Sequence, residues 1–211
     1  MKVKQRIVLA AAALLTLLSV GCTNYNLQDT GYADGNHNTT MLEYFKGDSY
    51  NFDSLQVMIR HAGLENVFEG KSQYGNNITC FGITNHSIRR YMLENEITSI
   101  QDMPVDECRR MVLDCVTAQR IMLDDVPEGA PSTDFETPIG TGGETITMLS
   151  GKRLWIYTYR DTYNDVPKAG PKRIYIVSEE TTKSSKVASH NIMTVTGVVH
   201  SLVYDFTLGD F

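Results

Sequence analysis

Cys22 is the residue whose surroundings most clearly predict a chemical reaction, the acylation of its thiol. The small residues Ser19 and Gly21 precede it, as a lipoprotein signal peptidase requires. Upstream come three basic residues within the first six and a continuous apolar run over 7–18, too short for a membrane span, which needs about 20 residues. We therefore expect residues 1–21 to be a cleaved signal peptide and Cys22 to carry palmitate or a similar acyl chain. An ordinary signal peptide with a chance cysteine is the alternative.

Residues 22–37 have no apolar period and are rich in Asn, Gly, Asp and Tyr, a composition typical of a flexible tether. The remaining residues, 38–211, suit a single domain with its own hydrophobic core. The chain is thus expected to be a membrane-anchored lipoprotein, held at the outer membrane or the cell surface through its lipid.

The charge of the chain argues against one class of partner. The formal net charge is -6, and removal of residues 1–21 takes away three basic residues and no acidic ones, which leaves -9. A protein this acidic is repelled by the phosphates of nucleic acid. We therefore expect no nucleic-acid partner.

Three cysteines remain beyond the anchor, Cys80, Cys108 and Cys115. An odd number in an exported protein argues against a disulfide framework. Cys108 and Cys115 lie in a stretch predicted to be helical, where a separation of seven residues holds Cα atoms about 10.5 Å apart, beyond the reach of a disulfide. We interpret all three as small buried hydrophobic residues.

The other residue types that carry chemistry show no catalytic or metal-binding pattern. The five histidines have no metal-ligand spacing, and the sequence has neither a Gly-x-Ser-x-Gly elbow nor a P-loop. The glycines of 139–143 follow no predicted strand and open no helix, so we expect a flexible loop there. The sequence therefore predicts no catalytic residue, no cofactor and no metal, and a protein that is not an enzyme.

Aromatic side chains concentrate in Trp155-Ile156-Tyr157-Thr158-Tyr159 and at Tyr163. Such a row can form a stacking surface for sugars or a patch for a protein partner. The alternative is that one face of a strand fills the core while loops cover the other. We favour the second interpretation.

The elements that must position these residues change in type along the chain. Apolar residues recur at helical spacing in the first half, with a helix start expected at Asp53 and a left-handed stop at Gly63. β-branched and aromatic runs between Gly and Pro turns follow, which predicts an α+β domain. The long connections 127–143 and 161–172 are candidate partner sites. Helices are expected at about 40–46, 53–62, 87–94 and 105–119, and strands at 77–83, 121–123, 145–149, 152–159, 173–178, 191–194 and 198–206.

Four segments, in order, resemble the fasciclin (FAS1) family. An apolar helix ends in Ala62-Gly63-Leu64, a strand runs Thr79-Cys80-Phe81-Gly82-Ile83-Thr84-Asn85, a turn reads Leu149-Ser150-Gly151, and the second hallmark is similar to Asn191-Ile192-Met193-Thr194-Val195-Thr196-Gly197-Val198-Val199-His200. Ile83 replaces the family's proline, and Asp114-Cys115 stands where the family usually has a Tyr-His pair.

The resemblance implies a FAS1-like fold over 38–211, with N-terminal helices packed on a wedge of twisted, mostly antiparallel β-sheets. It marks five motif positions, to which we assign structural roles: Thr79, Phe81, Thr84, Gly197 and His200. It also implies adhesion, or binding to a matrix, glycan or partner protein at the cell envelope. The alternative is an accessory subunit of an envelope nutrient-uptake or assembly complex.

Overall fold

A computed structural model describes residues 35–134 and 137–211. The predicted signal peptide, Cys22 and the tether up to residue 34 lie outside the described residues. Gly35–Phe211 forms one compact unit, so the ordered body begins slightly before the expected start at residue 38. No helix within the described ranges is long and apolar enough to cross a bilayer.

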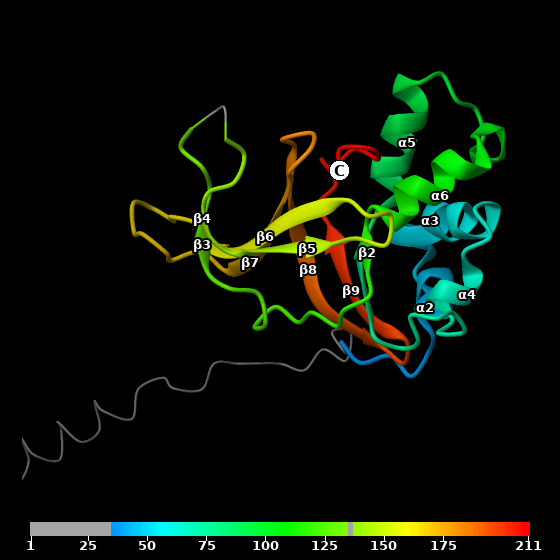
Figure 1. Cartoon of the computed structure of the whole chain (residues 1–211), viewed down its shortest axis with the longest axis horizontal. Helices are drawn as coiled ribbons and strands as arrows, with labels where there is room; N and C mark the ends of the chain where they lie inside the picture. The colour runs from blue at the N-terminus through cyan, green and yellow to red at the C-terminus, as the bar shows by residue number, and fades with distance from the viewer. Residues whose placement is uncertain (1–34, 135–136) are drawn as a thin grey trace, which may run out of the picture. The chain divides into compact units, whose positions relative to one another are not determined.

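The chain order confirms the mixed architecture, because helices dominate the first half and strands the second (Figure 1). The helices are α2 (Met41–Gly47), α3 (Ser49–His61), α4 (Glu65–Phe68), α5 (Asn85–Glu94) and α6 (Val105–Leu113), with a short 3₁₀ turn η1 (Ile100–Asp102). The strands are β1 (Ile78–Gly82), β2 (Val116–Thr117), β3 (Gly129–Ala130), β4 (Thr141–Gly142), β5 (Glu144–Thr147), β6 (Arg153–Arg160), β7 (Lys172–Ser178), β8 (Ser184–Thr194) and β9 (Gly197–Leu202).

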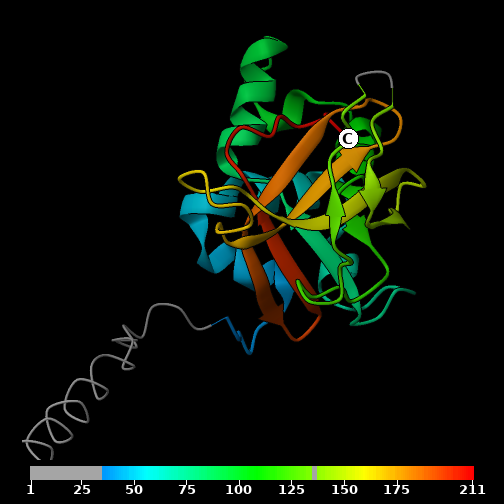
Figure 2. The ribbon, with the colours of Figure 1, turned by 90° about the vertical axis from the view of Figure 1, so that its left-hand side faces the viewer.

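Seven strands form one sheet in the order β2-β1-β9-β8-β7-β6-β5, and β3 pairs with β4 beside it. The β1–β9 pair is parallel and the other pairs are antiparallel. The sheet twists strongly, so that β9 and β6 run at a steep angle to each other (Figure 2). Its two edges meet at one end, where Leu149 N–H donates to Val116 O (2.7 Å) and Thr117 Oγ1 donates to Thr147 O (2.9 Å).

The helices gather beside β1, β2 and β9, whereas β3 and β4 lie at the far end of the sheet (Figure 1). The buried helical residues include Phe45, Phe52 and Met58, which join the same hydrophobic cluster as Phe81 and Val199 of the central strands. The core therefore lies between the helices and the middle of the sheet.

Local sequence signals explain two helix ends. Thr40 caps α2 in a reciprocal capping box with Glu43. Gly63 takes φ +63° and ends α3 as predicted, because Gly63 N–H donates to Arg60 O (3.0 Å) and Leu64 N–H to Ile59 O (2.9 Å). The predicted start of this helix at Asp53 is wrong, since α3 begins at Ser49 with Asp48 as its cap.

Two other predicted elements also differ. The helix expected over 105–119 ends at Leu113, and Val116–Thr117 instead forms strand β2 against β1. The β-branched side chains of Val116 and Thr117 suit a strand, and pairing with β1 outweighs the helical period of this stretch. Residues 121–123 form no strand, since Thr79 Oγ1 accepts the N–H of Ile121 (2.9 Å) in place of a ladder partner.

Candidate functional site

The two FAS1-like motif segments lie side by side in the sheet, next to its β2 edge. Strands β1 and β9 pair in parallel, with Ile78 opposite Gly197 and Phe81 opposite His200. The rings of Phe81 and His200 are stacked with centroids 5.8 Å apart, and both side chains are fully buried. Motif positions far apart in sequence therefore meet in one packed layer.

His200 is bonded to the main chain through both ring nitrogens. Nε2–H donates to Ile121 O (2.8 Å), and Nδ1 accepts the N–H of Asn191 (3.3 Å). Burial lowers the pKa of His200 to about 4, despite the opposing effect of the bond to Ile121 O. The neutral imidazole therefore links β9 to neighbouring segments. Because both ring nitrogens already take part in hydrogen bonds, neither is free to contact a substrate.

This burial predicts a pH-dependent stability. The unfolded chain binds a proton near pH 6.5 and folded His200 only near pH 4, so the stabilisation is complete above pH 6.5 and is lost as the pH falls toward 4. Half-buried His190, whose pKa is also lowered by burial and by Arg173, adds to the same trend. We expect the free energy of unfolding to fall by about 3 kcal/mol, measured by urea denaturation at pH 7 and 4. His200→Gln should flatten this profile, and His86→Gln, at an exposed histidine, should leave it unchanged.

The motif threonines are also buried and bonded. Thr79 Oγ1 donates to Gln119 O (2.6 Å) and so ties β1 to the segment that follows β2. Thr84 is the N-cap residue of α5, and its hydroxyl lies 3.2 Å from that of Ser87. These contacts fix the junction of β1 and α5.

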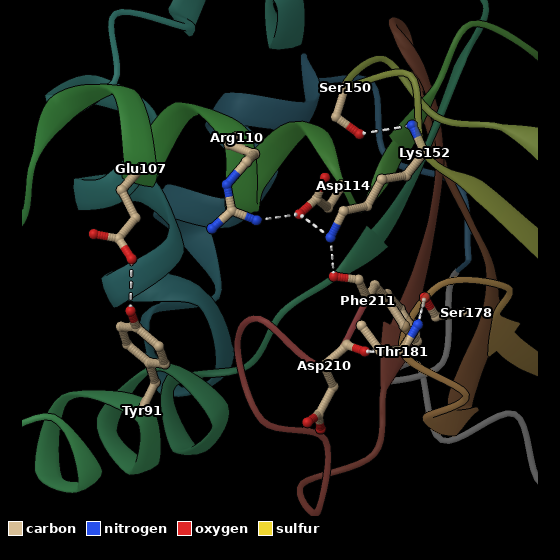
Figure 3. A network of polar contacts seen from close by, with 10 residues as sticks. All are labelled: Tyr91, Glu107, Arg110, Asp114, Ser150, Lys152, Ser178, Thr181, Asp210 and Phe211. Atoms are coloured by element: carbon tan, nitrogen blue, oxygen red, sulfur yellow. Dashed lines mark hydrogen bonds and ion pairs between the residues drawn. The ribbon is translucent and has the colours of Figure 1, made fainter.

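A polar network surrounds Asp114 at the end of α6 (Figure 3). Asp114 is 2 % exposed, and its Oδ2 lies 3.3 Å from both Arg110 Nη1 and Lys152 Nζ. Lys152 also donates to the main-chain oxygen of Phe211. Asp114 Oδ1 is buried without a hydrogen-bond partner among the described residues. The network joins the end of α6, the start of β6 and residues 210–211, which is a structural role.

The aromatic row of β6 is covered by loops, as we favoured from the sequence. Trp155 is 2 % and Tyr157 4 % exposed, and their rings stack at 4.3 Å. Trp155 Nε1–H donates to Gly142 O (3.0 Å). Gly143 lies so close that an added Cβ would be 2.6 Å from Trp155 Nε1, so glycine lets this loop close over the ring. These two rings are not a sugar-binding surface, whereas Tyr163 is 67 % exposed.

The three cysteines are free and buried. Burial raises the pKa of Cys108 to about 11 and raises the pKa of Cys80 and Cys115 further above the usual range. Thiols with raised pKa values are poor nucleophiles. Across the described ranges, His, Cys, Asp and Glu residues nowhere gather in a group of three or more suited to a metal ion.

A groove of about 510 Å³ opens between the α2–α3 corner and the junction of β8 with the end of β9. Strand β8 contains two register shifts against β9, between Val187 and Ile192, and such bulges bend a strand away from its partner. The floor includes Phe52, Ile192 and Leu202, and the polar rim includes Asp48, Tyr204 and Asp205.

The rim of the groove is held by contacts from three elements. Asp48 accepts from Asn51 Nδ2 (2.9 Å), and Tyr204 O–H donates to Asn51 Oδ1 (3.3 Å). Arg90 of α5 donates to the main-chain oxygens of Tyr204 (2.9 Å) and Asp205 (2.7 Å). Burial and the neighbouring Asp48 carboxylate raise the pKa of Tyr44 to about 12. The rim is thus preorganised, and the Tyr44 phenol is neutral at physiological pH.

This groove was not predicted from the sequence. The strand predicted over 198–206 included Tyr204 and Asp205, whereas β9 ends at Leu202. The useful signal was the change from the apolar pair Leu202-Val203 to Tyr204-Asp205. The bulges of β8 have no comparable sequence signal.

Comparisons with known proteins give a likeness in structure but none in sequence. No family model and no curated protein matches the sequence. The structure is similar to that of a FAS1 domain pair from the insect cell adhesion molecule Fasciclin I, with a TM-score of 0.47 and 11% sequence identity. The likeness covers 80% of this chain and 46% of that chain, so this chain spans about half of its length.

Proposed function

We propose that this chain is a lipid-anchored binding module of the cell envelope, with a FAS1-like domain that mediates adhesion or binds a matrix, glycan or partner protein. The observation that carries the FAS1 proposal is the parallel pairing of β1 with β9, because it brings the two motif segments onto neighbouring strands. Gly197 and His200 stand in register with the motif there. On this proposal the domain recognises a ligand and has no enzymatic activity.

The anchor is proposed from the sequence around Cys22, with the outer membrane or the cell surface as its location. Replacing Cys22 with serine removes the acylated thiol, and acyl chains contribute about 0.8 kcal/mol per buried CH₂. We expect Cys22→Ser to move the protein from the membrane pellet to the soluble fraction. Fractionation at high salt followed by immunoblotting measures this, with Cys108→Ser as the control. A Cys22→Ser protein that still sediments with membranes contradicts the anchor.

Binding is tested with the full chain in detergent on glycan arrays and matrix proteins, where specific retention supports the adhesion role. Absence of retention on every surface would contradict it.

A second candidate is an accessory subunit of an envelope nutrient-uptake or assembly complex. It is favoured by the exposed tip of the 161–172 loop, where Tyr163 and Val166 exchange main-chain hydrogen bonds of 3.1 and 3.0 Å and are 67% and 56% exposed. A stable tip with apolar side chains suits a contact with another protein. Co-purification of defined outer-membrane proteins from gently solubilised membranes, lost in Tyr163→Ser, would support this role.

A further inference from the structure

The groove between the α2–α3 corner and β8 has the size and chemistry of a binding site. Its volume of about 510 Å³ falls within the range of small-ligand pockets, about 300–1,000 Å³. An apolar floor with a few polar groups on the rim is also typical of such pockets. Buried Phe52 and Leu202 supply that floor.

The charged side chains that line the groove are all acidic. Among the described residues that line it, the charged side chains are the carboxylates of Asp48 and Asp205, and no lysine, arginine or histidine is among them. Both carboxylate oxygens of Asp48 accept hydrogen bonds from Asn51 Nδ2. Asp205 is exposed, and its carboxylate makes no hydrogen bond or ion pair with another described residue. Arg90 contacts this rim through main-chain oxygens and the Thr207 hydroxyl, so neither groove carboxylate is ion-paired with a described residue.

Tyr204 adds an aromatic face beside this carboxylate. Its side chain is 50% exposed, and the ring of His86 packs against it with centroids 4.8 Å apart. The bonds to Asn51 and Arg90 hold it in place, so little conformational entropy is lost when a ligand packs on it. An electron-rich ring next to a carboxylate favours a cation through cation–π and charge-assisted contacts.

We propose that this groove receives a lysine or arginine side chain of a partner protein. The apolar floor suits the aliphatic stem of such a side chain, and Asp205 with Tyr204 suits its charged head. The mature chain carries a formal charge of -9, obtained by removing three basic residues from the net -6 of the full sequence, which steers basic partners toward it. The inference rests on the proposed binding function and names the chemistry of its partner.

The test uses the full chain in detergent and three acetylated, amidated Gly-X-Gly peptides, with X as lysine, arginine or norleucine. Norleucine retains an aliphatic stem and lacks the charge. We expect the lysine and arginine peptides to bind at least fivefold more tightly than the norleucine peptide. Chemical-shift perturbations should concentrate at Ser189, Ile192 and Tyr204, and raising the salt from 0.05 to 0.5 M should weaken binding.

Variants separate the groove from the general acidity of the protein. We expect Asp205→Asn to lower the affinity for the lysine peptide about fivefold and Tyr204→Leu about threefold. Asp106→Asn, which removes one exposed carboxylate from α6 outside the groove, should have no effect. Far-UV circular dichroism checks that each variant is folded.

Three outcomes would overturn the inference: equal binding of the lysine and norleucine peptides, equal effects of Asp205→Asn and Asp106→Asn, or binding of methyl glycosides in the groove in place of the basic peptides. Failure here leaves the Cys22→Ser fractionation result standing, so the two proposals fail separately.

Discussion

Gly197→Ala is expected to lower the free energy of unfolding by about 4 kcal/mol, one of the largest effects a single methyl group can have. Gly197 begins β9 opposite Ile78 of β1 and has φ +151°. A Cβ added there would lie 2.0 Å from Ile78 O and 3.1 Å from Ile78 Cγ1. Strands β1 and β9 must therefore separate beside the buried side chains of Ile78 and Val198. Urea denaturation at pH 7 measures the change.

Gly151→Ala is the matched control for this prediction. Gly151 also has positive φ, +93°, but an added Cβ meets no atom within 4 Å. Only backbone strain remains there, which costs about 1 kcal/mol. Equal losses in the two variants would show that contact with Ile78 is not the cause, and a stable Gly197→Ala protein would contradict the close approach of β1 and β9.

The sequence was sufficient to predict those elements whose ends depend on neighbouring residues. The stop at Gly63 follows from its left-handed conformation, and the central strands follow from β-branched runs bounded by turn residues. The start of α3 was predicted at Asp53 because Gln56 completes a capping pattern. Asp48 caps the helix instead, since a start there adds the turn that buries Phe52 against the core.

Long-range contacts decided what the sequence could not predict. Helix α6 ends early because Val116 and Thr117 complete the edge of the sheet beside β1. The groove depends on two register shifts in β8 and on Arg90 of α5, which fixes Tyr204 from 114 positions away. The ion pair of Asp114 could not be predicted either, because its partner Lys152 lies on another element. Such pairs become visible only when the chain has folded.

The Asp114 network gives the second large effect, because Lys152 compensates a buried charge. Asp114 is 2% and Lys152 16% exposed, and the two side chains lie 3.3 Å apart. Removing one partner of a buried ion pair leaves the other charge desolvated. We expect Lys152→Met, which keeps the aliphatic stem, to lower the free energy of unfolding by about 3 kcal/mol. Loss of the bond to Phe211 O should also speed amide exchange at Asp210 in the terminal segment.

A double-mutant cycle distinguishes a lost ion pair from lost packing. In Lys152→Met the buried carboxylate of Asp114 keeps only the half-exposed Arg110 as a cationic partner. Adding Asp114→Asn removes that carboxylate charge, so the double variant should recover most of the lost stability. Lys71→Met is the control, because Lys71 belongs to an exposed pair with Glu69 (2.7 Å), and such pairs contribute little. If the two single substitutions simply add, the charge of Asp114 is not what Lys152 stabilises, and the network in Figure 3 holds the chain end through packing alone.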